Sequence, residues 1–386
     1  MDSKETSWFS PAGEIHLQKR EEPNRENAKE MNFAGRMFAP PHQNRWRGVF
    51  HINRKPQSPW SKATIAALSI GIPFVIGGFL GQLQWALLAG IGGYTSLYVH
   101  NESYKQRAVK LLWVNLGLTV SFGLGLITAA SPWAMALAIG GVSAASTFLC
   151  GVFRVPPPAG FFFVLVCAVG TGLPVDLSAT PLRMGIAFLG GCLAWVIAMS
   201  GWLLGSGYRG TNETQVTNRG ARHEFRSAFD LHSPIWATSL RNGIAVLFAT
   251  LLAFAFGIER PYWVPLSCAS VLRGATMLDV VNRTIQRSIG TAVGVIIAGG
   301  IFIMQPSIWM LGLYVMILQF VTELIIVRNY AFAVIFITPL ALIIAETGRA
   351  DMTISTLIGS RLLDTLLGCA IGAAAALLYW KHPVSE

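Results

Sequence analysis

Charged side chains are scarce in this sequence. Asp, Glu, Lys and Arg make up 12% of its 386 residues, whereas hydrophobic residues make up 53%. A soluble domain contains about 25% charged residues, so a soluble chain of this length would lack the polar groups needed to cover its surface. The mean hydropathy of +0.52 agrees with this exclusion. The composition therefore predicts an integral membrane protein that lies in a lipid bilayer.

Motifs for catalysis and metal binding are also missing. The sequence has no Walker loop, no Gly-x-Ser-x-Gly, no HExxH and no carboxylate pair with glycosidase spacing, so we expect no enzyme. The five cysteines lie in apolar runs without CxxC spacing, which indicates small buried hydrophobic residues rather than metal ligands or disulfides. We expect no cofactor and no metal. No signal peptide is visible, because a long polar stretch precedes the first apolar run.

Long apolar runs, in contrast, are abundant. A membrane-spanning helix needs roughly 20 apolar residues. Candidate spans lie near 63–80, 84–100, 108–128, 132–151, 156–174, 181–205, 240–258, 262–276, 287–304, 307–326, 330–346 and 357–379. The runs at 262–276 and 330–346 could be tilted, broken or re-entrant. We predict an all-α polytopic membrane protein with about 12 transmembrane helices.

The two halves of the sequence resemble each other. "KATIAAL" at 62–68 aligns with "RNGIAVL" at 241–247. Several single residues align at nearly the same offset: Trp85 with Trp263, Lys105 with Arg283, and Arg183 with Arg361. Basic loops also recur in matching places, so both halves have the same orientation. The pattern predicts two parallel six-helix repeats that form a pseudo-dimer about an axis along the membrane normal.

These repeats define the expected domains. We assign the first six-span repeat to 59–205 and the second to 239–380, with a cytoplasmic linker at 206–238 between them. Residues 1–58 are polar, rich in proline and expected to form a largely disordered cytoplasmic tail. Residues 381–386 form a short cytoplasmic tail at the other end.

Basic residues exceed acidic ones, 29 to 19, which raises nucleic-acid binding as an alternative. Their placement argues against it: all but Arg183, Arg260, Arg349 and Arg361 lie in tails and loops that would share one side. Such a bias sets the orientation of a membrane protein. It predicts a multi-pass protein of the cell (cytoplasmic) membrane with both termini cytoplasmic and no nucleic-acid partner.

Ionisable residues inside the apolar runs are the main candidates for function, because each costs about 2.5–3.5 kcal/mol at the centre of a span. Arg361 and Asp364 lie three residues apart, on one face of the last span. One interpretation is an internal salt bridge that holds the helix in its bundle. The other is an anion contact at Arg361 and proton coupling at Asp364. Arg183 repeats the arginine, whereas Ile186 stands where the carboxylate would be.

Three further arginines, Arg273, Arg283 and Arg287, lie near the cytoplasmic ends of their spans. Arg283 and Arg287 are four residues apart and therefore share a helix face. Such arginines can extend to the lipid headgroups or set orientation. The alternative is a cationic vestibule that raises the local concentration of an anionic substrate.

Small residues follow these arginines. Gly290, Thr291 and Gly294 belong to the small-xxx-small stretch "GTAVG", which allows helices to approach closely in lipid. We assign Gly368 in the last span the same packing role.

The second half resembles a known family. "RPYWVPLSCASVLR", "NRTIQRSIGTAVG" and "RLLDTLLGCAIG" contain, in order, Tyr-Trp before a span, Arg-x-x-Gly-Thr at the start of the next, and Arg-x-x-Asp-Thr-x-x-Gly in the last. This pattern is similar to the fusaric acid resistance (FUSC) and aromatic acid exporter family. The matching positions are Tyr262, Trp263, Arg287, Gly290, Thr291, Arg361, Asp364, Thr365 and Gly368. The first half matches only through the internal repeat.

The resemblance implies a multi-span efflux transporter that exports small organic anions, chiefly aromatic carboxylates, with the proton gradient. Arg183 and Arg361 would attract the carboxylate, Asp364 would couple to protons, and Arg273, Arg283 and Arg287 would line the inner entrance. A passive organic-anion channel and a non-transporting membrane scaffold or envelope-assembly protein remain alternatives, and a homo-oligomer is left open. The loop motif Gly-x-x-x-Asp-Arg-x-Gly-Arg of major-facilitator carriers is absent from "NESYKQR".

Overall fold

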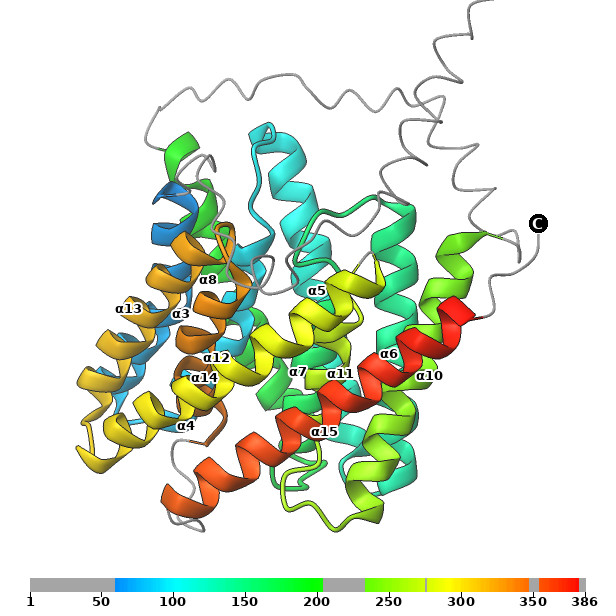
Figure 1. The fold of residues 1–386 in the computed structure, drawn as a ribbon. Helices are drawn as coiled ribbons and strands as arrows, with labels where there is room; N and C mark the ends of the chain where they lie inside the picture. Colours follow the sequence, from blue (N-terminus) through cyan, green and yellow to red (C-terminus); the bar gives the residue numbers. More distant parts are fainter. Residues whose placement is uncertain (1–59, 204–232, 275, 347–353, 382–386) are drawn as a thin grey trace, which may run out of the picture. The chain divides into compact units, whose positions relative to one another are not determined.

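The computed structural model describes residues 60–203, 233–274, 276–346 and 354–381, and these form helices, turns and loops without a β-strand (Figure 1). Eight helices are long and apolar enough to cross a membrane. The prediction of an all-α polytopic protein is therefore confirmed, while the count of 12 spans stays a prediction. The tails at 1–58 and 382–386 and most of the linker at 206–238 lie outside the described residues.

The eight candidate spans belong to long helices. These are α3 (Trp60–Leu80), α5 (Tyr104–Thr128), α6 (Pro132–Val152), α8 (Thr180–Leu203), α10 (Pro234–Ala255), α12 (Met277–Ile303), α13 (Ile308–Ile326) and α15 (Ile354–Lys381). Helix α10 begins inside the predicted linker, because Ser233 caps it and Pro234 fits its first turn.

Four shorter helical segments lie between the long ones. They are α4 (Leu83–Gly92) with the 3₁₀-helix η1 (Gly93–Tyr98), α7 (Phe161–Thr171), α11 (Trp263–Val271) and α14 (Tyr330–Glu346). A short segment is thus the second and the fifth helical segment of each half. Two of these short helices, α11 and α14, lie in the runs at 262–276 and 330–346. For these two runs the sequence allows tilted, broken or re-entrant helices.

Local signals at helix ends recur between the halves. Ser131 caps α6 and Ser307 caps α13, each accepting a hydrogen bond from a backbone N–H of the first turn. Gly81 follows α3 and Gly257 follows α10, both with φ near +65°. Glycine suits these positions because other residues rarely adopt that conformation. The first helix of each half therefore ends in the same kind of turn.

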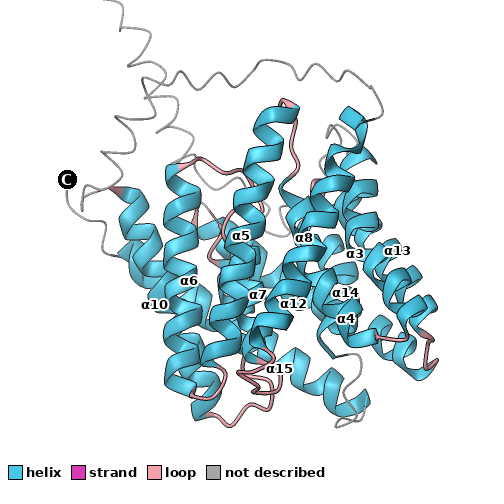
Figure 2. Cartoon of the chain, turned by 180° about the vertical axis from the view of Figure 1, so that it is seen from behind, coloured by secondary structure: helices cyan, strands magenta, loops and turns pink. Residues whose placement is uncertain are grey.

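The packing of helices also recurs. Within the first half, α4 packs on α8 and α5 packs on α7 and α8; within the second, α11 packs on α15 and α12 packs on α14 and α15. The halves meet reciprocally, since α3 contacts α13 and α10 contacts α6 (Figure 2). Each half therefore supplies its first and third long helices to the contact with the other.

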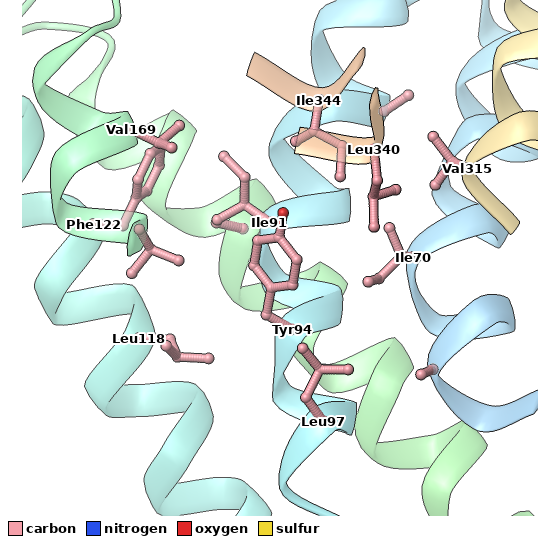
Figure 3. Close-up of a cluster of buried hydrophobic side chains, with 14 of the residues drawn as sticks. Ile70, Ile91, Tyr94, Leu97, Leu118, Phe122, Val169, Val315, Leu340 and Ile344 are labelled. Carbon is pink, nitrogen blue, oxygen red and sulfur yellow. The ribbon is translucent and has the colours of Figure 1, made fainter. Parts of the chain in front are cut away.

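Buried hydrophobic side chains from both halves share one core. Figure 3 shows Ile70 of α3 and Tyr94 of η1 near Leu340 and Ile344 of α14, with Val315 of α13 beside them. Many large hydrophobic side chains are instead exposed, among them Trp113, Trp133 and Ile296. Exposed apolar surface of this extent fits contact with lipid tails rather than with water.

Candidate anion site

One end of each short helix borders a common region. Tyr98 ends η1, Phe161 begins α7, Tyr330 begins α14, and Arg273 follows the end of α11. The Cζ of Arg273 lies 5.8 Å from the centroid of the Phe161 ring. Burial and the neighbouring Arg283 cation lower the pKa of Arg273, whereas Tyr330 and Tyr98 act in the opposite direction. Arg273 of the second half therefore reaches residues of the first half.

Arg283 and Arg287 of α12 meet at Tyr330. The Cζ of Arg283 lies 5.1 Å from the centroid of the Tyr330 ring. An Nη1 proton of Arg287 is donated to the Tyr330 hydroxyl at 3.2 Å. Ser270 of α11 is also within hydrogen-bonding reach of that hydroxyl. The structure thus brings Arg273, Arg283 and Arg287 together around one tyrosine, which the sequence did not single out.

This cluster has an excess of positive charge. None of these three arginines forms an ion pair with a carboxylate of the described residues. Arg287 is 5% exposed, and its Nε, like the Oγ1 of Thr291 one turn later, makes no hydrogen bond within that part of the chain. A buried guanidinium without a counterion is costly, so the cluster is suited to receive an anion.

Arg361 and Asp364 lie deeper in the bundle, on α15. Both are almost fully buried, at 3% and 1% exposure. The Cζ of Arg361 lies 3.6 Å from the centroid of the Trp263 indole, a close cation–π contact. The Cys369 thiol is within electrostatic range of both Arg361 and Arg287. Helix α15 packs on α12, the helix that carries Arg283 and Arg287.

Arg183 lies apart from the other arginines. Its Nη1 donates to the carbonyl oxygen of Pro174 at 2.7 Å, in the loop before α8. The carboxylate of Asp176 in that loop accepts hydrogen bonds from the Ser178 hydroxyl and from the backbone N–H groups of Ala179 and Ser178. These bonds, the hydroxyl's first, lower the pKa of Asp176, and Arg183 lowers it a little further. No contact between Arg183 and Arg361 is present among the described residues.

The predicted packing residues lie where helices approach each other closely. A Cβ atom on Gly290 would lie 2.7 Å from the carbonyl oxygen of Ala331, and one on Gly294 would lie 2.6 Å from the Cβ of Thr338. Both glycines thus face α14. A Cβ atom on Gly368 would overlap the carbonyl oxygen of Val264 on α11. Thr291 is 1% exposed on α12.

Sequence reasoning missed a second polar cluster, in the first half. Lys110 of α5 pairs with Glu102 at 2.5 Å. Lys62 of α3 pairs with Glu323 of α13 at 3.5 Å. Arg107 donates to the carbonyl oxygens of Ala198 and His100. The positive charges looked like orientation signals in the sequence, and only the long-range packing shows their partners.

The comparisons with known proteins point to the second half. Residues 247–375 match a family model described as "Fusaric acid resistance protein-like". Over these residues the chain is similar to that family model. The resemblance seen in the motifs is therefore confirmed. The matched region contains every predicted site residue except Arg183.

Relatives extend the match beyond that region. The chain is 29% identical to "Uncharacterized membrane protein YvaC" of Bacillus subtilis (strain 168) over 473 aligned positions, covering 87% of this chain and 75% of the relative. It is 30% identical to "Uncharacterized protein YhfK" of Escherichia coli (strain K12) over 161 positions, covering 41% of this chain but only 22% of that protein. No solved structure matches the chain. The name of the first of these relatives, a membrane protein, agrees with the multi-pass membrane protein that the eight apolar helices indicate.

Proposed function

We propose that the protein is a membrane transporter that exports small organic anions, with the carboxylate held at Arg273, Arg283 and Arg287. The observation that supports this proposal is the cluster of three guanidinium groups without a carboxylate partner among the described residues. Arginine suits carboxylate recognition because its donors match the two oxygens. The resemblance to a fusaric acid resistance protein-like model agrees with transport.

Aromatic carboxylates are the preferred substrate class in this proposal. The rings of Phe161 and Tyr330 flank the guanidinium groups of Arg273 and Arg283. An aromatic anion could place its carboxylate on the arginines and its ring against these side chains. Arg361, stacked on Trp263, would form the next step of the path, and Arg183 would act at its other end.

Proton coupling is assigned to Asp364. This carboxylate is 1% exposed and lies on the same helix as Arg361. A carboxylate withdrawn from water can exchange a proton as the surrounding charge changes. An Asp364→Asn protein should keep some flux but lose its dependence on a pH gradient. Normal transport with an unchanged pH dependence would remove Asp364 from the mechanism.

The architecture that we propose for this transporter is a pair of parallel six-helix repeats. The recurring order of long and short helices, the paired caps and the reciprocal contacts of α3 with α13 and α10 with α6 support it. The basic bias supports a cell-membrane protein with both termini on the cytoplasmic side, which is part of this proposal. The four short helices would then line the path at the axis between the repeats.

A flux assay in lipid vesicles tests the proposal. The full chain is reconstituted, and uptake of a panel of aromatic and aliphatic carboxylates is measured with and without a pH gradient. Arg273→Gln should reduce kcat/KM for the preferred anion about 10- to 100-fold, because a hydrogen bond to a charged group contributes about 1.5–3 kcal/mol. Arg328→Gln is the matched control, since Arg328 is exposed between α13 and α14.

The outcomes separate the alternatives. Flux that requires the gradient and depends on Arg273 supports the exporter. A voltage-driven anion current without proton movement would favour a passive channel. No flux of any carboxylate from a folded protein would overturn transport and favour a scaffold.

A further inference from the structure

His100 occupies an unusual position in the linker between η1 and α5. It is the only histidine of the described residues. Its Nδ1 lies 2.8 Å from the carbonyl oxygen of Tyr98, and its Nε2 lies 3.0 Å from that of Pro157. The ring therefore bridges the end of η1 to the loop between α6 and α7. A neutral imidazole has a single N–H and can donate to only one of the two carbonyls at a time.

Cations surround this ring from two helices. The Nζ of Lys110 on α5 lies 3.4 Å from its Nδ1, and Lys62 on α3 is within electrostatic range. Arg107 of α5 donates to the backbone carbonyl of His100 at 3.1 Å. An imidazolium at this place would have an ammonium group almost in contact, and like charges so close repel strongly.

Carboxylates face the lysines rather than the ring. Glu102, in the same linker as His100, pairs with Lys110, and Glu323 of α13 pairs with Lys62. Each lysine is thus held beside His100 by its own counterion. The position of both ammonium groups depends on these two pairs, so the affinity of His100 for a proton depends on them as well.

We propose that His100 is a second proton-binding site of this protein. The neutral ring bridges the α6–α7 loop and α5, because its Nε2–H donates to the carbonyl oxygen of Pro157 while its Nδ1 accepts from Lys110. The protonated ring has no acceptor for Lys110 and is driven from that bridge by the ammonium group. The bridge lies between the end of η1 at Tyr98 and the start of α7 at Phe161. Both helix ends border Arg273. Release of the bridge loosens that side of the candidate anion site. Its link to flux rests on the proposed transport function.

The direction of the effect follows from the surroundings. Burial lowers the pKa of His100 from its ordinary value, Lys110 and Lys62 lower it further, and the two carbonyls oppose them in part. A proton therefore binds less readily in the bridged state than in a state where the ring reaches water. The bridge is fully stable above the ordinary histidine pKa of about 6.5 and weakens as pH falls through the lowered pKa.

Titration of His100 in the full chain, labelled with ¹⁵N-histidine and held in lipid nanodiscs, provides the first test. The His100→Gln protein assigns its signal. We expect a midpoint below that of an exposed histidine. Lys110→Met should raise this midpoint by about one pH unit or more, because a like charge within about 4 Å is removed. Lys105→Met, with the same charge change on an exposed face of α5, should leave it unchanged.

Hydrogen exchange of residues 153–161, corrected for its intrinsic pH dependence, provides the second test. Exchange should accelerate at least threefold as His100 becomes protonated in the wild type. His100→Gln and Lys110→Met should abolish that acceleration. Tyr98→Phe, which removes a bond from the Tyr98 hydroxyl to Ala159 in the same loop, should raise exchange at every pH but keep the acceleration.

These measurements do not depend on transport. A His100 midpoint that Lys110→Met leaves in place, or loop exchange that keeps its pH dependence in His100→Gln, would overturn the inference even if carboxylates are transported. An absence of carboxylate flux, with both expected shifts present, would overturn the proposed function and leave the proton site standing.

Discussion

The two halves of the molecule share a helical plan but differ in how they treat positive charge. In the first half Lys110 has Glu102 as a counterion, and Arg107 donates to backbone carbonyls. In the second half Arg273, Arg283 and Arg287 have no carboxylate partner among the described residues. The shared features are apolar contacts and helix ends, which determine packing. The differing features are charges, and these concentrate the proposed anion chemistry in one half.

The largest effect is expected where both halves pack a glycine against a backbone carbonyl. A Cβ atom on Gly190 of α8 would overlap the carbonyl oxygen of Ala89, as one on Gly368 of α15 would overlap that of Val264. Gly190→Val and Gly368→Val should each destabilise the protein by about 3 kcal/mol, since the helices must move apart. Thermal unfolding in nanodiscs measures the loss.

Two other glycines of the same helices are the matched controls. A Cβ atom on Gly185 of α8 or on Gly359 of α15 would meet no atom within 4 Å. Valine at these positions should leave the unfolding temperature nearly unchanged. If Gly190→Val were as stable as Gly185→Val while Gly368→Val lost stability, the close packing would be a property of one half alone.

Much of this packing could be predicted from local sequence. Apolar runs predicted where helices lie. In lipid, a span must satisfy its backbone hydrogen bonds within a helix and expose apolar side chains. The pattern "GTAVG" indicated close approach at Gly290 and Gly294, which face α14. Local patterns of this kind concern residues close together in the chain. They can therefore be recognised without knowledge of the fold.

The partners of the charged residues could not be predicted in this way. Arg273 lies over Phe161 and Lys62 pairs with Glu323, contacts between residues far apart in the sequence. Arg183 and Arg361 occupy matching places in the proposed repeat, yet one donates to a loop carbonyl and the other stacks on Trp263. A shared sequence position does not specify a shared partner, because the partner depends on which distant segment packs beside that position.

A smaller effect is expected from exchanging charge at matching positions of the two halves. Arg283→Gln should raise the KM for the transported anion about threefold to tenfold with little change in kcat, because Arg283 stacks on Tyr330 and attracts the anion from a distance. The increase should shrink at high salt, where such attraction is screened. Lys105→Gln, its counterpart in the first half, is exposed and should leave KM unchanged. Equal effects of both substitutions would contradict a site whose positive charges all come from the second half.

The smallest effect concerns the two reciprocal contacts between the halves. The α3–α13 contact contains the Lys62–Glu323 ion pair at 3.5 Å, whereas the α6–α10 contact contains a neutral hydrogen bond of 3.4 Å from Asn242 to Thr147. Lys62 is partly exposed, so solvent weakens the pair.

A double-mutant cycle of Lys62→Met and Glu323→Gln should give a coupling free energy of about 0.5–1 kcal/mol, measured from thermal unfolding. The cycle of Asn242→Ala and Thr147→Ala should give a similar or smaller value, because a neutral hydrogen bond contributes about 1 kcal/mol or less. A coupling of several kcal/mol at Lys62–Glu323 alone would show that charge stabilises one contact between the halves and not the other. The two contacts would then differ in energetics as well as in composition. The carboxylate partner of Lys62 would then stabilise the contact between the halves, in addition to neutralising the charge of the lysine.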